Sequence, residues 1–162
     1  MARESPGYGA IAAGTIMRSF KSMLVLLVGL TALMYALQNF ADIGEMRRQV
    51  AATHPGTGVS AASWAGFAMM TLIQLAIAAV ALRGAWDLFA ARNGSAEDFK
   101  EAKSLAVWAG GLSLLSWFFL SIMVGAGLFH WGTDSGGAAL AKTFALGTTS
   151  ALTILFVWGT KD

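Results

Sequence analysis

Four polar side chains recur at helical spacing in the stretch MYALQNFADIGEMRRQ, where a long apolar run gives way to amides and an acid. They lie at i, i+3, i+4 and i+7 and would share one face of a helix: Tyr35, Gln38, Asn39 and Asp42. Phenol, amide and carboxylate groups can orient a mostly apolar ligand, so these residues are candidate contacts for a ligand or partner. The polar pattern continues through Glu45, which favours a helix leaving a membrane over a ligand site.

Two further polar side chains lie deep inside apolar segments. Gln74 interrupts the run MMTLIQLAIAAVA, and a lone amide in such a run typically bonds to a neighbouring helix, so we expect partners among the hydroxyl groups of the later segments. Trp117 lies near the middle of another apolar segment, where its indole N–H needs an acceptor. Both are candidate contacts for a ligand or partner, and packing within a bundle is the favoured interpretation.

Small and hydroxyl residues form one face in each of the last two apolar segments. Gly110 and Ser113 lie on one such face, and Thr143, Gly147 and Ser150 lie on the other. Small side chains let helix backbones approach closely. Packing within the bundle therefore explains these faces without a substrate.

The groups that most enzymes and metal sites use are scarce. The chain has no cysteine and only two histidines, which excludes disulfides, thiolate nucleophiles and cysteine-ligated metals. The cores of the apolar segments contain no Lys, Arg, Asp or Glu, although embedded charge is the usual mark of ion transport and proton relay. We expect no enzymatic activity, no metal and no cofactor.

Composition predicts a membrane protein. Of 162 residues, 56% are hydrophobic and 12% are charged, whereas soluble domains carry about 25% charged residues. A hydrocarbon core is crossed by about 20 apolar helical residues, and four spans are expected at about 22–41, 63–90, 104–129 and 141–158. The period-two alternation of a membrane β-barrel is absent. The predicted fold is all-α, an integral membrane four-helix bundle with residues 18–162 as one domain.

The distribution of Lys and Arg predicts the orientation. Eight of the eleven lie on the side that holds the N-terminus, the loop between the second and third spans, and the C-terminus. This bias predicts that both termini are cytoplasmic in a multi-pass protein of the bacterial inner (plasma) membrane. Cations gathered at segment ends suit anionic lipid headgroups rather than nucleic acid. Residues 1–17 are predicted to be a mobile or surface-lying tail rather than a cleaved signal peptide.

The stretch ARNGSAEDFKEAK predicts a tight turn between the second and third helices. Asn93 and Gly94 can end one helix, and Ser95 can cap the next. Glu97 and Asp98 would then lie in the first turn, where acids favour the helix dipole. The third helix should therefore begin before its membrane span.

The chain resembles the bacterial domain-of-unknown-function 2165 family, which is described as predicted small integral membrane proteins. The resemblance covers about residues 18–160 and rests on the stretches YALQNFAD, LRGAWDLFAAR, FKEAKSLAVWAGGL and WFFLSIMVGAGLF. It implies the four-span architecture and no established activity. The family pattern often has an acid where this chain has Gln74, which implies that a proton-coupled role at that position is not expected here.

Two functional hypotheses follow. The favoured one is a non-enzymatic accessory or stabilising subunit that associates laterally with a larger membrane complex, for example a respiratory or other electron-transport complex; it rests on the small-residue faces, the interfacial tryptophans and the absence of embedded charge. The alternative is a binder or carrier of an apolar ligand, such as a quinone or lipid, held near Tyr35, Gln38 and Asn39. The expected partners are therefore an integral membrane complex and membrane lipids, with no nucleic acid.

Overall fold

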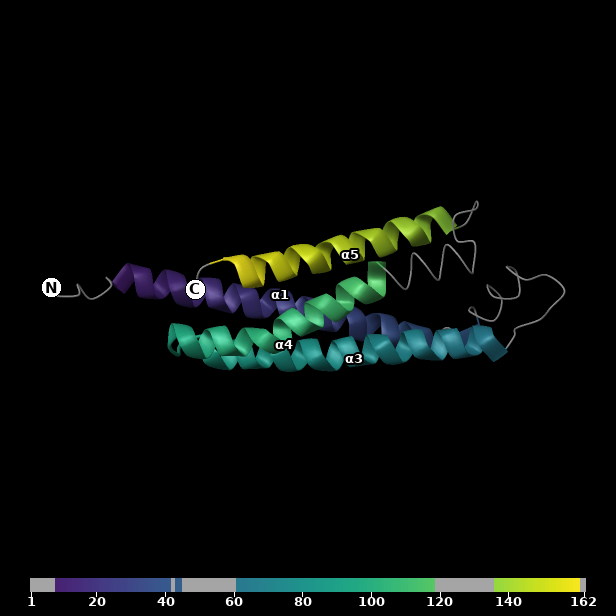
Figure 1. Ribbon diagram of the computed structural model, residues 1–162, viewed down its shortest axis with the longest axis horizontal. Helices are drawn as coiled ribbons and strands as arrows, with labels where there is room; N and C mark the ends of the chain where they lie inside the picture. Colours follow the sequence, from purple (N-terminus) through teal and green to yellow (C-terminus); the bar gives the residue numbers. More distant parts are fainter. Residues whose placement is uncertain (1–7, 42, 45–60, 119–135, 161–162) are drawn as a thin grey trace.

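The computed structural model describes residues 8–41, 43–44, 61–118 and 136–160, which form long helices and contain no strand (Figure 1). The four helices are α1 (Tyr8–Ala41), α3 (Ala61–Ala91), α4 (Ala96–Leu114) and α5 (Gly136–Gly159). A π-helical turn over residues 115–118 extends α4. The predicted all-α fold with four helices is confirmed.

Three helices contain stretches long and apolar enough to cross a membrane: Ala13–Ala41, Trp64–Ala91 and Ala141–Gly159. The 28 residues of the second stretch measure about 42 Å at 1.5 Å per residue, more than the hydrocarbon core of about 30 Å. The predicted third span, 104–129, begins within α4, but its second half lies outside the described residues. The cytoplasmic location of the termini stays a prediction.

α1 begins at Tyr8, inside the segment 1–17 that the sequence predicts to be a mobile or surface-lying tail. Residues 8–17 continue the helix of the first span without interruption. The stretch contains no proline, and its alanines favour a helix, although its two glycines do not. The 34 residues of α1 measure about 51 Å, so the helix extends beyond the hydrocarbon core.

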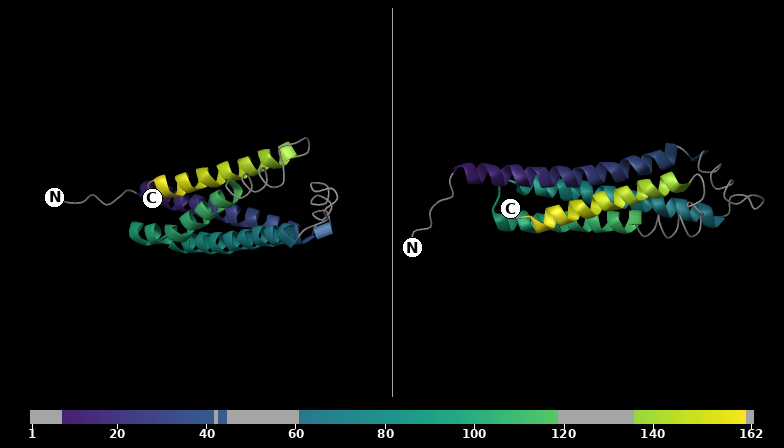
Figure 2. Two further views of the ribbon diagram at one scale, coloured as in Figure 1. Left: turned by 45° about the vertical axis from the view of Figure 1, so that its right-hand side comes forward. Right: turned by 90° about the horizontal axis from the view of Figure 1, so that it is seen from above.

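The helices run along one long axis, and helices that follow each other in the sequence pack side by side (Figures 1 and 2). α1 packs on α3, α3 on α4, and α4 on α5, while α1 also touches α4 and α5. The start of α1, the turn between α3 and α4, and the last turn of α5 lie at one end (Figure 1), which we call the Phe99 end. The opposite end of α1 contains Asn39, and we call it the Asn39 end.

Small residues allow this close packing. A Cβ atom on Gly84 would lie 2.8 Å from the backbone nitrogen of Ala106, so α3 and α4 touch there through their backbones. A Cβ on Gly110 would clash with Ile154, and one on Gly147 would lie 2.8 Å from the ring of Phe118. Side chains of the neighbouring helix therefore occupy the space beside both glycines, which lets α4 and α5 approach closely.

Candidate functional site

Two of the predicted site residues meet in a polar cluster between α1 and α3. The side-chain amide of Asn39 donates to Oε1 of Gln74 over 2.9 Å and to Oγ1 of Thr71 over 3.2 Å. Gln74 and Thr71 are buried, with 4% and 2% of their surfaces exposed. Thr71 also donates to the carbonyl of Phe67, one turn earlier in α3. Asn39 therefore joins the two helices through two interhelical hydrogen bonds.

The described partner of Gln74 differs from the expected ones. We expected hydroxyl groups of the later spans, but its amide oxygen accepts from Asn39 on α1. The face of α3 that holds Gln74 also holds Thr71, one turn away, and α1 packs on that face. The cluster is therefore formed by helices that are adjacent in the sequence, whereas α4 packs on a different part of α3, around Gly84.

Tyr35 and Trp117 form a second contact, between α1 and α4. Their ring centroids lie 4.9 Å apart at 65°, an edge-on aromatic pair. The ammonium group of Lys142, from α5, lies 4.8 Å from the centre of the Tyr35 ring, at the distance of a cation–π interaction. Trp117 is buried and Tyr35 is half-buried, while Lys142 is exposed. Three helices thus meet around the Tyr35 ring, one turn from Asn39.

The polar side chains of the first span do not all point the same way. Tyr35 and Asn39 contact other helices, whereas Gln38 is exposed. The reason is geometric: at 3.6 residues per turn, residue i+4 is offset by roughly 40° to one side of residue i, and residue i+3 by roughly 60° to the other side. A neighbouring helix can therefore cover Tyr35 and Asn39 and leave Gln38 at its edge. Asp42, the fourth predicted residue, lies outside the described residues.

A serine pair joins α4 to α5. The hydroxyl groups of Ser113 and Ser150 lie 2.8 Å apart and are buried, and Ser150 also lies within hydrogen-bond distance of the carbonyl of Leu146. This pair lies on the two small-residue faces that the sequence indicates. The polar groups of these faces therefore bond to each other within the bundle.

The Phe99 end contains a cluster that the sequence analysis missed. Three cationic groups surround the ring of Phe99: the guanidinium carbon of Arg18 lies 5.1 Å from its centre, and the ammonium groups of Lys21 and Lys103 lie 5.9 and 5.7 Å from it. Phe99 and Lys21 are fully buried, and Lys103 is 5% exposed. These two lysines therefore point into the bundle, whereas the preference of the other cations for lipid headgroups stays a prediction.

The cations of this cluster also connect separate parts of the chain. Arg18 donates to the carbonyls of Gly94 over 2.8 Å and Arg92 over 3.3 Å, both beside the turn between α3 and α4. Lys21 donates to the carbonyl of Thr160, at the end of α5, over 2.8 Å. The available sequence signal was the spacing of Phe99 and Lys103 at i and i+4, which places them on one face of α4.

The predicted turn between α3 and α4 is confirmed in detail. The hydroxyl of Ser95 accepts from the backbone N–H of Asp98 over 3.1 Å, and the Asp98 carboxylate accepts from the backbone N–H of Ser95 over 2.9 Å. This reciprocal pair is a capping box. Hydrogen bonding by Ser95, through its side chain first and its backbone second, lowers the pKa of Asp98 below its ordinary value. The turn thus fixes α4 at the point where Arg18 contacts the chain.

The described residues hold no group of three or more His, Cys, Asp or Glu side chains placed to bind a metal ion. An ion pair between Arg83 and Asp87, one turn apart on α3, has an N···O distance of 3.0 Å and is partly exposed. Such a pair belongs to the surface rather than to a site.

Long apolar helices whose polar groups bond to one another define the class of this protein, an all-helical integral membrane protein. The chain belongs to the DUF2165 family, described as predicted small integral membrane protein, which matches residues 17–158. No curated protein and no solved structure matches the chain. The family resemblance seen in the sequence is therefore confirmed, while location in the bacterial inner membrane stays a prediction.

Proposed function

We propose that this protein is a non-enzymatic accessory or stabilising subunit, which associates laterally with a larger integral membrane complex such as a respiratory or other electron-transport complex. The observation that carries the proposal is the outward face of α5. Three small residues one turn apart are exposed there: Ala141, Ala145 and Thr149. Small residues at this spacing allow a second helix to approach closely within a membrane.

The two faces of α5 have different neighbours. Gly147 and Ser150 are buried against α4, whereas the small residues of the outward face are exposed and are covered by none of the described helices. The hydroxyl of Thr149 donates to the carbonyl of Leu146 within the same helix, so this face is apolar to an approaching partner. A partner helix could therefore pack on α5 without disturbing the bundle.

The outward face of α1 differs from that of α5. Its exposed residues are large and aliphatic: Leu27, Leu30, Met34 and Leu37. Large flexible side chains pack well against lipid tails, whereas small ones leave the backbone accessible to another helix. α5 also exposes large apolar side chains, among them Phe144, Leu152 and Leu155, so what sets it apart is the row of small residues between them. That row favours protein contact on α5 and lipid contact on α1.

The interior of the bundle supports a structural role. The amides of Asn39 and Gln74 bond to each other, as do the hydroxyl groups of Ser113 and Ser150. Catalysis needs a nucleophile, base or oxyanion donor directed at a substrate. Polar groups that bond across helix interfaces act instead as connections between helices.

Native mass in mild detergent tests this proposal. The wild-type protein, extracted from the membranes of its own source, should migrate in an assembly larger than a monomer. Ala145→Leu and Thr149→Leu should each release it as a free monomer, because the added side chain separates the helices. The control Ala79→Leu makes the same change on the exposed face of α3 and should leave the assembly intact. A wild-type protein that runs only as a free monomer would contradict the proposal.

A second candidate function is the binding of an apolar ligand with a polar head, such as a quinone or lipid, near Tyr35, Gln38 and Asn39. The observation in its favour is the half-buried ring of Tyr35, which contacts Trp117 and Lys142 from two other helices. Aromatic rings with one cation can hold a polar head between helices. Lipid extraction and mass spectrometry of the purified protein test this candidate, and the absence of a stoichiometric ligand would count against it.

A further inference from the structure

Three tryptophans are exposed, each on a different helix. Trp86 of α3, Trp108 of α4 and Trp158 of α5 are 63%, 66% and 66% exposed. The indole group combines a large apolar ring with one hydrogen-bond donor, its N–H group. A medium that suits these exposed side chains must therefore accept an apolar body and a polar tip at the same time.

The contact between α3 and α4 places two of these tryptophans at nearly the same level of the bundle. Gly84 of α3 packs on the backbone of Ala106 of α4. Trp86 lies two residues beyond Gly84 toward the Phe99 end, and Trp108 lies two residues beyond Ala106 in the opposite direction. At 1.5 Å per residue, the two tryptophans are about 6 Å apart along the bundle.

Trp158 falls between the other two. Gly110 of α4 packs on the side chain of Ile154 of α5. Gly110 lies four residues from Ala106, away from the Phe99 end, and Trp158 lies four residues beyond Ile154 toward that end. The two offsets cancel, so Trp158 is level with Ala106. The three tryptophans therefore span about 6 Å of depth, which is similar to the thickness of one headgroup layer, about 5–7 Å.

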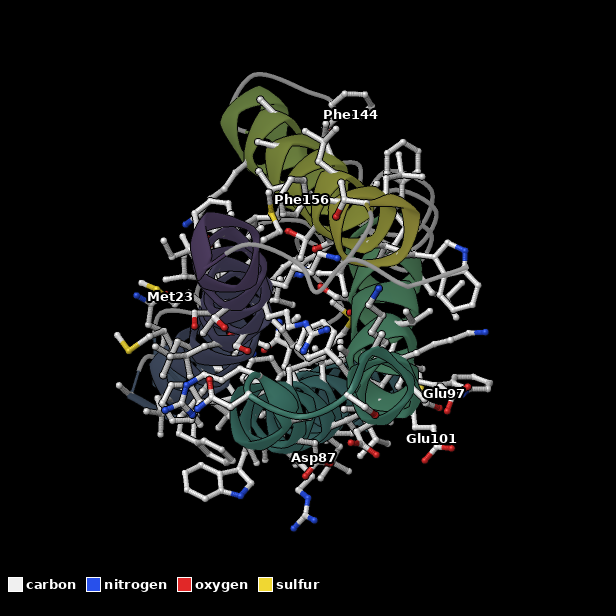
Figure 3. All side chains as sticks on the ribbon, turned by 90° about the vertical axis from the view of Figure 1, so that its left-hand side faces the viewer. Met23, Asp87, Glu97, Glu101, Phe144 and Phe156 are labelled. Carbon is white, nitrogen blue, oxygen red and sulfur yellow. The ribbon has the colours of Figure 1, made fainter. Side chains whose placement is uncertain are left out.

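The exposed residues of α4 and α5 change in character at this level. On the side of the Phe99 end, α4 exposes Glu97, Lys100 and Glu101, and the two acids point outward in the view along the bundle from that end (Figure 3). On the opposite side, the exposed residues include Leu115 of α4 and Leu152 of α5. A change from charged to aliphatic side chains is expected where a helix enters the hydrocarbon core.

Two features of the other helices bear on this level. Arg83 lies one turn from Trp86 on the hydrocarbon side, but its guanidinium group pairs with Asp87, nearer the Phe99 end, which directs the cation toward the headgroups. The exposed side chains of α1 stay apolar as far as Ile16, so α1 does not show the change. The level therefore rests on α3, α4 and α5.

The arrangement of the helices favours lipid over protein as the partner of these tryptophans. In the view along the bundle, α5 lies opposite α3, and α1 and α4 lie between them (Figure 3). A partner helix packs on one side of a bundle, whereas lipid headgroups surround the bundle at one depth. Indole rings also prefer the membrane–water interface, where the ring contacts acyl chains and the N–H group finds oxygen acceptors.

We propose that Trp86, Trp108 and Trp158 form a belt in the lipid headgroup layer, and that the turn between α3 and α4 lies outside the hydrocarbon core together with the first two turns of α4. The cations around Phe99 would then also lie outside the core, where charge costs less. Trp64 lies about 33 Å from Trp86 along α3, close to the core thickness of about 30 Å. It would mark the second boundary.

Fluorescence quenching in bilayer discs tests the belt. The chain contains six tryptophans, and variants that keep one of them, with the others replaced by Phe, report one depth each. For Trp86, Trp108 or Trp158 alone, phosphatidylcholine brominated near the headgroup should quench the emission at least about twofold more strongly than phosphatidylcholine brominated near the chain ends. Trp117 alone, which is 6% exposed, should be quenched weakly by both lipids. The proposal is overturned if any belt tryptophan is quenched as strongly by the chain-end bromines, or if neither lipid quenches it.

Labelling of single cysteines tests the same boundary with every tryptophan in place. The chain contains no cysteine, so Glu101→Cys places one thiol outside the belt, and Leu115→Cys and Leu152→Cys each place one inside it. In bilayer discs, which leave both membrane faces open, a membrane-impermeant maleimide should modify Glu101→Cys at least about tenfold faster than the other two. Equal rates would overturn the proposal. Both measurements use the purified full-length protein, so they do not depend on the proposed partner complex.

Discussion

Loss of the Asn39 amide should destabilise the bundle more than loss of its exposed neighbour. Asn39→Ala removes the donor that Gln74 and Thr71 share across the interface of α1 and α3. Gln74 is buried, so its amide oxygen would lose its partner without gaining water. A buried polar group left without a partner costs about 1–3 kcal/mol. Gln38→Ala, on the exposed side of the same turn, should be within about 0.5 kcal/mol of wild type.

A double-mutant cycle separates the hydrogen bond from other effects. Interhelical hydrogen bonds in membranes contribute about 0.6 kcal/mol on average and up to about 1.7 kcal/mol. Asn39→Ala combined with Gln74→Ala should therefore cost less than the sum of the single variants, by roughly this coupling energy. The cycle isolates the 2.9 Å bond between the two amides, because the bond from Asn39 to Thr71 is lost with and without Gln74.

Reversible unfolding in mixed micelles of mild detergent and dodecyl sulfate measures these differences. At this chain length, 1 kcal/mol corresponds to about 2–4 °C in Tm, so thermal unfolding provides a second readout. The reasoning would be refuted if Gln38→Ala were as destabilising as Asn39→Ala, or if the two single variants were strictly additive. Strict additivity would mean that the two amides do not bond to each other in the folded protein, and an equal loss in Gln38→Ala would mean that burial of the Asn39 cluster does not decide the effect.

Three further predictions concern α4 and its contacts. Gly84→Ala should destabilise the protein by about 1–3 kcal/mol, because the added Cβ would lie 2.8 Å from the backbone nitrogen of Ala106. The control is Gly111→Ala, whose Cβ would meet no atom within 4 Å. It should be neutral or stabilising in the same unfolding assay. Ser95→Ala should remove the capping box and lower stability by about 0.5–2 kcal/mol, measured by thermal unfolding. Because the pKa of Asp98 is lowered in the folded protein, its ionised form is stabilising above the ordinary aspartate pKa of about 3.9; the stability advantage of wild type over Asp98→Asn should be constant near neutral pH and decrease as the pH falls through the folded-state pKa.

Sequence patterns that depend on neighbouring residues predicted the structure well. The length of each apolar segment identified the helices. The order of Asn93, Gly94 and Ser95 predicted both the end of α3 and the cap of α4. The small-residue faces indicated close packing within the bundle, and the bond between Ser113 and Ser150 shows that two of these residues meet where α4 packs on α5. These features are set by local chemistry and by side-chain size, both of which can be read from the sequence.

Features that depend on how the helices are rotated could not be predicted. α3 is apolar on nearly every side, so periodicity does not indicate which face Gln74 turns toward a neighbour. The rotation of α1 likewise decides that Asn39 points inward and Gln38 points outward. The cluster around Phe99 requires residues more than 70 positions apart to meet, and no local pattern predicts this.

Photo-crosslinking from α5 tests the central claim, that this helix carries the surface for lateral association. The chain contains no cysteine, so Ala145→Cys provides one specific attachment point for a photoreactive maleimide in native membranes. We predict one discrete crosslinked species of higher mass from Ala145→Cys, and none from Ala79→Cys on the exposed face of α3. The account would be contradicted if Ala145→Cys gave no protein crosslink, or if both positions gave the same products.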